Sequence, residues 1–400
     1  MAHARLRHVL PLLKKKLKFS RVVTVQGARQ TGKSFLARDI IPKALSGAKY
    51  VSLDDGTQKA LATQNPNTFL ISDVSARPLI IDEAQKAPEL FDAVKLNVDE
   101  NPEPGRFILL GSTEFSREVR IRESLTGRLS RIRIYPFNLA ESLQLPPNPS
   151  KLLSLMNSKP RVRRADVLRY LDRGGFPGIF SVRSQSEAYS LLKDWLSLVC
   201  ERDILQFKAS RPDPELARDI LEVVPILELA DPTAIMKKLR KSPLKVRKQL
   251  LLLEQLFAVH RLRPHRMGTG KARYLLCDCG LAGMLGASLR HQLTTAALSE
   301  QLSQRSYRLD GEPTGFSLTY YRGVRGGLID LIIEDRQQVV AIKVMDREQV
   351  DLRELEILHA FEAKMQAGGE TKKITKIAWG PYLSRSNIKG VELWPWESLF

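Results

Sequence analysis

Short apolar runs alternate with stretches of helical periodicity from residue 20 to residue 145. This alternation predicts a parallel α/β sheet, because parallel strands are buried on both faces and are joined by helical crossovers. The predicted strands, each rich in Val, Ile or Leu, are 21–26, Tyr50–Asp54, Pro78–Asp82, Arg106–Gly111 and Arg131–Tyr135. After the first strand an apolar helical pattern runs to Ile41, and we expect Pro42 to end that helix.

The segments on either side of this region have other patterns. Leucines at helical spacing predict a basic amphipathic helix over 1–19, which either packs on the α/β region or contacts nucleic acid or a membrane surface. A Pro-rich linker over 145–150 precedes a helical lid over 151–210, which includes a long helix over Glu187–Phe207. Residues 211–290 predict a winged helix, with strands near 258–262 and 273–276. Residues 295–400 predict an α+β domain with strands Ser317–Tyr321, Leu328–Ile333 and Val339–Val344.

A phosphate-binding motif stands between the first predicted strand and its helix. Gly27-Ala28-Arg29-Gln30-Thr31-Gly32-Lys33-Ser34 reads G-x-x-x-x-G-K-[ST]. Strand, loop and helix together direct backbone N–H groups and a positive helix end at the β- and γ-phosphates of a nucleotide. Gly27 and Gly32 allow an approach that a Cβ would block, Lys33 would contact the phosphates, and Ser34 would ligate Mg²⁺. ATP and Mg²⁺ are therefore the predicted cofactors.

Further candidate residues follow the later strands of this region. Asp82 and Glu83 end the third strand, where Asp82 would hold Mg²⁺ and Glu83 would polarise the attacking water. Thr113, after the fourth strand, would either sense the γ-phosphate or cap a helix. Arg128 would be an arginine finger or a surface residue, and Arg202 a second sensor or an ordinary ion-pair partner.

Five segments in this order resemble a prokaryotic family of AAA-type ATPases that carry a C-terminal domain of unknown function: GARQTGKS, YVSLDD, PLIIDEAQKAPELFDAVK, RFILLGST and ESLTGR. Gly174–Pro177, Glu201–Asp203 and Tyr274–Leu281 extend the resemblance over nearly the whole chain. The resemblance implies ATP binding and hydrolysis, a winged-helix middle, and a C-terminal fold like that of PD-(D/E)XK nucleases.

The nuclease resemblance also implies a set of metal ligands in the C-terminal domain. Asp330 and Lys343 match the motif, and Glu300 matches its helical acid. Leu328 and Ala341, however, stand where acids are usual. Because a catalytic metal relies on its carboxylates, we interpret this site as degenerate.

Positive charge is concentrated in the predicted winged helix. The chain has a net charge of +19, and residues 235–275 hold twelve Lys and Arg but one acid, Glu254. Such a segment favours a polyanionic partner, DNA before RNA, although protein contact remains the alternative. The candidate nucleic-acid contacts are Lys245, Lys248, Gln249, Arg266 and Lys271.

The sequence thus predicts an α/β ATPase with a lid, a winged helix and a nuclease-like domain. No apolar run approaches the ~18 residues of a membrane span, and three cysteines form neither a zinc nor a disulfide pattern, so a cytoplasmic protein is expected. We expect a Mg²⁺-dependent ATPase that couples its nucleotide state to nucleic-acid binding. The alternatives are a nucleotide-gated regulator with little turnover that contacts a protein, and an ATP-controlled DNA nuclease. A homo-oligomer is left open.

Overall fold

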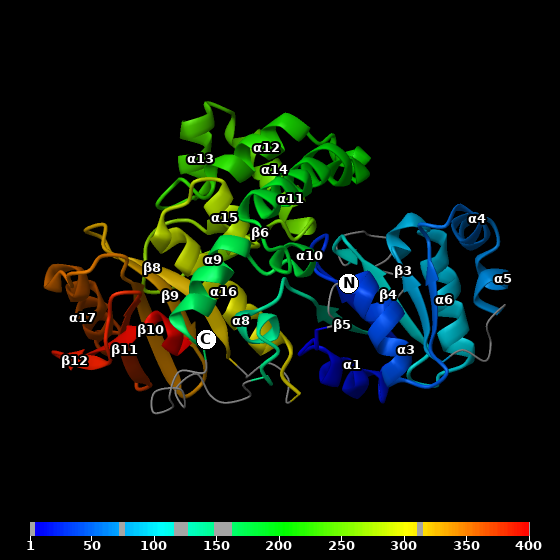
Figure 1. The fold of residues 1–400 in the computed structure, drawn as a ribbon, viewed down its shortest axis with the longest axis horizontal. Coiled ribbons are helices and arrows are strands. Elements are labelled where there is room, and N and C mark those ends of the chain that lie inside the picture. The colour runs from blue at the N-terminus through cyan, green and yellow to red at the C-terminus, as the bar shows by residue number, and fades with distance from the viewer. Residues whose placement is uncertain (1–4, 72–76, 116–126, 148–161, 310–314, 400) are drawn as a thin grey trace.

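Two β-sheets organise the protein, with helices of the middle of the chain between and above them (Figure 1). A computed structural model describes residues 5–71, 77–115, 127–147, 162–309 and 315–399. Residues 123–126 of the ESLTGR segment, 148–150 of the linker and 151–161 of the predicted lid lie outside the described residues. None of the helices in the described ranges is both long and apolar enough to span a membrane.

The first sheet has five parallel strands in the order β2-β3-β4-β1-β5. The strands are β1 (Val22–Gln26), β2 (Lys49–Ser52), β3 (Leu79–Asp82), β4 (Phe107–Gly111) and β5 (Leu129–Arg133). All five predicted strands are confirmed, with small shifts at their ends. The three central strands are buried throughout, because helices cover both faces of the sheet.

Helices pack on each face of this parallel sheet. One face is covered by α4 (Gly56–Gln64), α5 (Pro66–Ile71) and α6 (Glu89–Glu100). The other is covered by α1 (Leu10–Leu17) and the helix that follows the P-loop. The N-terminal helix is shorter than predicted and has Pro11 in its first turn. Its buried Leu12, Leu13 and Leu17 pack against the sheet, in agreement with the prediction that this helix packs on the α/β region.

The helix after the P-loop does not end at Pro42. α2 (Lys33–Phe35) continues as a π-helical segment, η1 (Leu36–Ile40), and then as α3 (Ile41–Ala44). The π-helical segment shifts the hydrogen-bond pattern, so that Pro42 falls in the first turn of α3, where its missing N–H is not needed. The prediction that Pro42 ends the helix is therefore wrong. The helix ends two residues later, at Ala44.

Helices fill the middle of the chain. They are α8 (Leu139–Ser142), α9 (Arg164–Arg173), α10 (Pro177–Phe180), α11 (Gln185–Ser197), η5 (Leu198–Asp203), η6 (Ile204–Gln206), η7 (Lys208–Ser210), α12 (Pro214–Val223), α13 (Pro232–Leu239), α14 (Pro243–Gln255), α15 (Cys279–Met284) and α16 (Leu289–Ser306). The single helix expected over Glu187–Phe207 is α11 continued by η5, a π-helix, and η6, a 3₁₀ helix. α11 to α15 share one apolar core.

The second sheet has eight strands in the order β12-β13-β11-β10-β9-β8-β6-β7. Its strands are β6 (Val259–Pro264), β7 (Arg273–Leu276), β8 (Ser317–Arg322), β9 (Leu328–Glu334), β10 (Gln338–Val344), β11 (Lys373–Gly380), β12 (Ser386–Ile388) and β13 (Val391–Pro395). α17 (Leu352–Ala367) packs on the sheet, and η8 (Trp396–Leu399) follows its last strand.

The predicted wing belongs to this second sheet. β6 and β7 form the expected antiparallel hairpin, but β6 also pairs with β8, with Arg263 opposite Thr319. The segments predicted as separate domains over 211–290 and 295–400 therefore share one sheet. A hairpin built into a sheet in this way is not a free wing.

Candidate functional site

The loop between β1 and α2 borders a cavity of about 670 Å³ at the carboxyl edge of the parallel sheet. Gly32 has a φ of +85°, a conformation that L side chains rarely adopt. A Cβ on Gly27 would lie 2.1 Å from the carbonyl oxygen of Ile134. Both positions thus require glycine, and they place Lys33 and Ser34 in the wall of the cavity.

Lys33 is held inside the loop by its own backbone. Its Nζ donates hydrogen bonds to the carbonyl oxygens of Gly27 and Ala28, at 2.8 Å and 2.7 Å. Burial lowers the pKa of Lys33 to about 8, although Glu83 and Asp82 partly offset this effect. A phosphate entering the cavity would stabilise the charged amine and replace these backbone contacts.

Asp82 is buried at the end of β3 with both carboxylate oxygens engaged. The Tyr50 hydroxyl donates to Oδ2 at 2.9 Å, and the backbone N–H of Glu83 donates to Oδ1 at 3.0 Å. Burial and the Asp82 charge raise the pKa of Tyr50 to about 12, so this hydroxyl remains a donor. Sequence reasoning missed Tyr50 because a tyrosine in a predicted strand carries no signal of function.

The oxygen atoms of Ser34 and Asp82 fit a hard cation such as Mg²⁺. The described part of the chain contains no group of three or more His, Cys, Asp or Glu side chains that could hold a metal by themselves. A Mg²⁺ ion at this site would therefore depend on phosphate oxygens and water for its other ligands.

Glu83 follows Asp82 in a left-handed backbone conformation, with a φ of 55°. Such a conformation costs about 1–3 kcal/mol for a residue with a side chain, and it is enriched at functional sites. The Gln85 side-chain amide and the Ser112 hydroxyl both donate to Glu83 Oε2, the latter at 3.3 Å. These contacts fix the carboxylate in the wall of the cavity.

Ser112, and not Thr113, lines the cavity after the fourth strand. Ser112 lines the cavity and contacts Glu83, whereas Thr113 is 1% exposed and its carbonyl oxygen accepts a hydrogen bond from the Gln26 side chain. The Thr113 hydroxyl has no hydrogen-bond partner in the described part of the chain. Thr113 is therefore buried beside β1 and does not reach the cavity.

Arg128 lies at the opposite edge of the sheet. It immediately precedes β5, which is parallel to β1, so it is at the amino edge, while the P-loop follows the carboxyl end of β1. Its guanidinium contacts Asp99 at the end of α6 with two hydrogen bonds, 2.5 Å and 3.0 Å long. Arg128 is therefore not an arginine finger for the nucleotide cavity of its own chain.

The lid contacts the P-loop through Arg29. The Arg29 guanidinium donates to both oxygens of buried Asp203, at 2.5 Å and 2.9 Å, and Trp195 Nε1 donates to the Arg29 carbonyl oxygen at 3.1 Å. Arg202 also donates to Asp203, at 3.3 Å. Arg202 thus forms an ion pair, as one of its two predicted roles expected. It also lines a second, larger cleft.

Two motifs that are far apart in the sequence meet behind the cavity. Asp278 Oδ2 accepts a hydrogen bond from the backbone N–H of Gly175 at 2.6 Å, and a Cβ on Gly174 would lie 2.0 Å from Asp278 Oδ1. This contact sets the start of α10, where Pro177 faces Gly32 of the P-loop. The apolar residues that line this side of the cavity are Phe137, Pro177, Ile179 and Leu191.

Arg7 ties the N-terminal segment to the P-loop, and sequence reasoning missed it. Its buried guanidinium donates to the carbonyl oxygens of Thr31 and Tyr135, at 2.6 Å and 2.8 Å, and to Glu141 Oε1 at 3.1 Å. The group lies 4.8 Å from the centre of the Phe137 ring. A lone arginine among many basic residues gives no sequence signal. Its structural role depends on carbonyl groups that are brought together only by the fold.

The candidate nucleic-acid residues separate into two groups. Lys245 is exposed and Lys248 half-buried on α14. Gln249 is buried and donates to the Asp213 carbonyl oxygen, so it is not available to a nucleic acid. Arg266 pairs with Glu334 and Glu370, and Lys271 donates to the Thr233 hydroxyl.

A basic face covers α13, the following turn and the start of α14. It comprises Lys237, Lys238, Arg240, Lys241, Lys245, Arg247 and Lys248. No acid occurs from residue 232 to residue 253. Within the described residues, none of these seven side chains forms an ion pair, so the charge of this face is available to a partner.

The predicted nuclease residues do not form a metal site. Asp330 accepts two hydrogen bonds from Arg290, both 3.0 Å long, and one from the Val344 backbone N–H. Burial alone would raise the pKa of Asp330, but the Arg290 charge and its hydrogen bonds hold the pKa below its ordinary value. Lys343 donates to the Leu328 carbonyl oxygen at 3.0 Å. The site thus contains a cation where a metal ligand set would need anions.

Glu300 contributes to the link between the two sheets. It is fully buried on α16 and accepts a hydrogen bond from the backbone N–H of Leu139 at 3.0 Å. Leu139 begins α8, which follows the last strand of the parallel sheet. Glu300 was expected to be the helical acid of a nuclease site, but its carboxylate is engaged with this backbone.

Comparison with known proteins assigns the N-terminal part of the chain. Residues 19–143 match the family model of an AAA domain, and residues 164–292 match that of a domain of unknown function (DUF8612). These matches confirm the expected resemblance to AAA-type ATPases with a second, uncharacterised domain. The parallel sheet, its P-loop and the AAA match together make this part a nucleotide-binding ATPase domain.

Curated relatives extend beyond the matched region. Uncharacterized protein Rv2008c of Mycobacterium tuberculosis is 25% identical over 206 residues, which are 52% of this chain and 41% of that protein. Uncharacterized protein MJ1544 of Methanocaldococcus jannaschii is 24% identical over 205 residues, which are 49% of this chain and 45% of that protein. The match therefore spans less than half the length of each relative.

Solved structures show only distant likeness. A signal-transduction ATPase with numerous domains and a tetratricopeptide repeat sensor, from Pyrococcus horikoshii, has a TM-score of 0.28 at 13% identity, covering 75% of this chain and 45% of that one. The DNA clamp loader delta protein of Bacillus subtilis has a TM-score of 0.26 at 14% identity, covering 62% of this chain and 88% of that one. At these scores neither structure carries an argument about fold or function.

Proposed function

We propose that the protein hydrolyses ATP with Mg²⁺ and couples its nucleotide state to nucleic-acid binding in the cytoplasm. The observation that carries the enzymatic part is the convergence of Lys33, Ser34, Glu83 and Ser112 on one cavity at the carboxyl edge of the parallel sheet, next to Asp82, which accepts a hydrogen bond from the Glu83 backbone. The three cysteines are buried and unpaired, which is typical of a reducing compartment.

Each residue has a role that its position supports. Lys33 and the P-loop N–H groups would bind the phosphates, and Ser34 with Asp82 would hold Mg²⁺, which neutralises charge on the transferring phosphoryl group. Glu83 would accept a proton from the attacking water, and Ser112 would keep the Glu83 carboxylate in position. The apolar wall that includes Pro177 and Leu191 would contact the base.

The basic face supports the nucleic-acid part of the proposal. A helix–turn–helix with seven exposed or half-buried cations, and no acid from residue 232 to residue 253, has the charge that phosphate groups attract. The predicted wing contributes less than expected, because β6 is part of the second sheet and Arg266 is paired with acids. α14 is therefore the main proposed contact.

We expect Lys245→Ala combined with Lys248→Ala to weaken binding to DNA and to lower its salt dependence. The slope of log K against log salt should fall by ~0.9 for each duplex phosphate contact that is lost. Fluorescence anisotropy at several salt concentrations measures both quantities. Lys364→Ala on α17 is the matched control, and it should leave binding unchanged. A folded protein that binds no nucleic acid at low salt would favour the protein-contact alternative.

We also expect the protein to leave DNA intact. Hydrolysis of a phosphodiester with Mg²⁺ needs carboxylates that hold the metal near the scissile phosphate. Asp330 is engaged by Arg290, and Lys343 adds a second cation beside it. Plasmid, linear and single-stranded DNA incubated with the protein, ATP and Mg²⁺ or Mn²⁺ should be recovered uncut. Metal-dependent cleavage that disappears in Asp330→Ala would instead make the ATP-controlled nuclease the leading function.

A further inference from the structure

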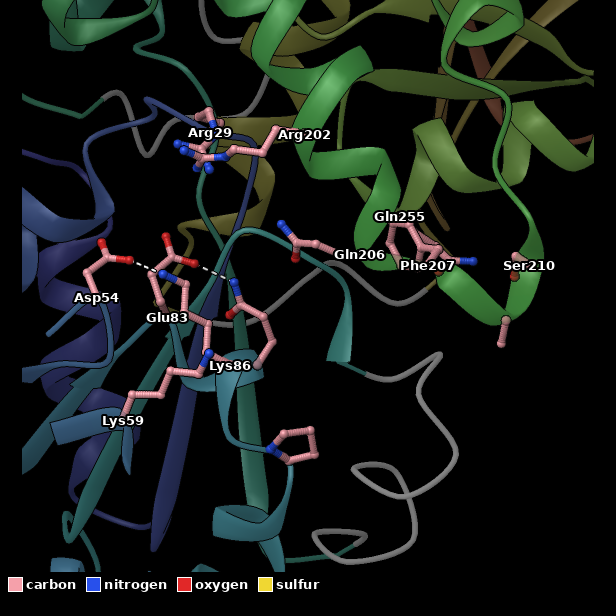
Figure 2. Close-up of a pocket in the computed structure, with 13 residues that line it drawn as sticks. Arg29, Asp54, Lys59, Glu83, Lys86, Arg202, Gln206, Phe207, Ser210 and Gln255 are labelled. Atoms are coloured by element: carbon pink, nitrogen blue, oxygen red, sulfur yellow. Dashed lines mark hydrogen bonds and ion pairs between the residues drawn. The ribbon is translucent and has the colours of Figure 1, made fainter. Parts of the chain in front are cut away.

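A second cleft, of about 1070 Å³, lies beside the nucleotide cavity (Figure 2). Arg29, Asp54 and Glu83 line both the cavity and the cleft. The attacking water that Glu83 would activate needs far less space than this cleft offers. The cleft is therefore large enough for a ligand other than water, at the side of Glu83 that faces the lid and α14.

Cations outnumber acids in the lining of this cleft. Arg29, Lys59, Lys86 and Arg202 line it together with Asp54 and Glu83. Lys86 pairs with Asp54, but Lys59 forms no ion pair within the described ranges. Arg202 uses Nε toward Asp203, and its side chain is 61% exposed. Two cationic groups can thus receive an anion from solvent.

The remaining lining includes groups that contact nucleotides well. Gln206 and Gln255 supply amides, Ser210 a hydroxyl, and Phe207 a half-buried aromatic ring. A cationic groove with an aromatic side chain is the usual arrangement for single-stranded nucleic acid, because each base offers a face for stacking.

One face of α14 connects this cleft to the basic face. Gln255, at the C-terminal end of α14, lines the cleft, and its carbonyl oxygen accepts a hydrogen bond from the backbone N–H of Glu114 at 3.1 Å. Residues at helical spacing lead back from it to the start of the helix, which is part of the basic face. These exposed or half-buried residues are Leu244, Lys248, Leu251 and Gln255.

We infer that the cleft is a second nucleic-acid site, which takes a single strand whose neighbouring nucleotides lie along α14. This inference rests on the proposed function and names the form of nucleic acid that the protein binds. Lys59 and Arg202 contact the phosphates of the strand, and Phe207 contacts a base. A duplex presents its phosphates on a convex surface, so it binds the basic face but does not enter the cleft.

Protection of an introduced thiol tests this inference directly. The three native cysteines are buried, so an exposed thiol at position 206 in the Gln206→Cys variant is labelled selectively by a maleimide. A thymidine oligonucleotide at about ten times its Kd should slow labelling ~10-fold, because only the free fraction reacts. In the Ala363→Cys variant, whose thiol lies on α17 outside the cleft, the oligonucleotide should have no effect.

Charge removal gives a second measurement that does not depend on the thiol. Lys59→Ala should lower the salt slope for the single strand by ~0.7, the value for one phosphate contact, and should leave the slope for duplex DNA unchanged. Lys364→Ala is the matched control. If the oligonucleotide binds and depends on Lys245 and Lys248 but neither protects the thiol nor responds to Lys59→Ala, the cleft site is wrong and the proposed function stands. If no nucleic acid binds, the cleft site and the nucleic-acid part of the proposed function are both wrong.

Discussion

Lys33→Ala should weaken ATP binding by ~10²-fold or more, because a hydrogen bond to a charged group contributes about 1.5–3 kcal/mol and Lys33 can donate more than one. The fold should survive, since within the described part of the chain the Lys33 amine forms hydrogen bonds only to the carbonyl oxygens of Gly27 and Ala28. Titration calorimetry measures the affinity, and circular dichroism checks the fold. Lys43→Ala, an exposed residue of α3, is the matched control.

The pH dependence of ATP binding identifies the Lys33 amine as the source of this effect. Burial lowers the pKa of free Lys33 to about 8, and bound phosphate would raise it by favouring the charged form. A pKa that is higher in the complex makes binding strongest below pH 8, and affinity is lost as the pH rises through 8. Lys33→Ala should lack this fall between pH 7 and pH 9. Equal affinities and equal pH profiles for parent and variant would contradict the assignment of the P-loop.

The sequence predicted the parallel sheet and the P-loop well, because both depend on neighbouring residues. A run such as Leu79–Asp82 specifies a buried strand by itself, and the spacing from Gly27 to Ser34 specifies a loop whose backbone needs glycine. The order of the motifs then placed Asp82 and Glu83 at the same edge as Lys33, since all strands of this sheet are parallel.

Residues whose partners are distant in the sequence could not be predicted in the same way. Arg7 takes its place from Thr31, Tyr135 and Glu141, and Glu300 from the Leu139 backbone N–H. No local pattern indicates these contacts, because the fold creates them. Some join elements more than a hundred residues apart, and one joins the N-terminal segment to the P-loop.

The sequence did not show at which end of a strand, or on which side of a helix, some candidate residues lie. Arg128 was expected to be an arginine finger or a surface residue, and the direction of β5 puts it at the sheet edge opposite the nucleotide cavity of its own chain. Gln249 shares a predicted helix with Lys245, but its side chain is buried and its amide donates a hydrogen bond to the Asp213 carbonyl oxygen. Helical periodicity gives relative directions around an axis, and packing decides which direction is solvent.

Glu83→Gln should retain ATP binding and lose turnover by ~10² or more, the usual contribution of a positioned general base. The substitution keeps the size of the side chain and an oxygen that can accept hydrogen bonds from Gln85 and Ser112. It removes the ability to accept a proton from water. Steady-state phosphate release measures turnover, and titration calorimetry with Mg²⁺ and ATP measures binding. Glu100→Gln, an exposed residue at the far end of α6, is the matched control.

The result separates an ATPase from a nucleotide-gated regulator, since only the former depends on Glu83 as a base. The left-handed backbone at Glu83 and the two donors on its carboxylate together fix one orientation in the wall shared by the cavity and the cleft. If parent and Glu83→Gln release phosphate at the same rate, Glu83 is not the base. If the parent itself binds ATP without releasing phosphate, the regulator becomes the better description.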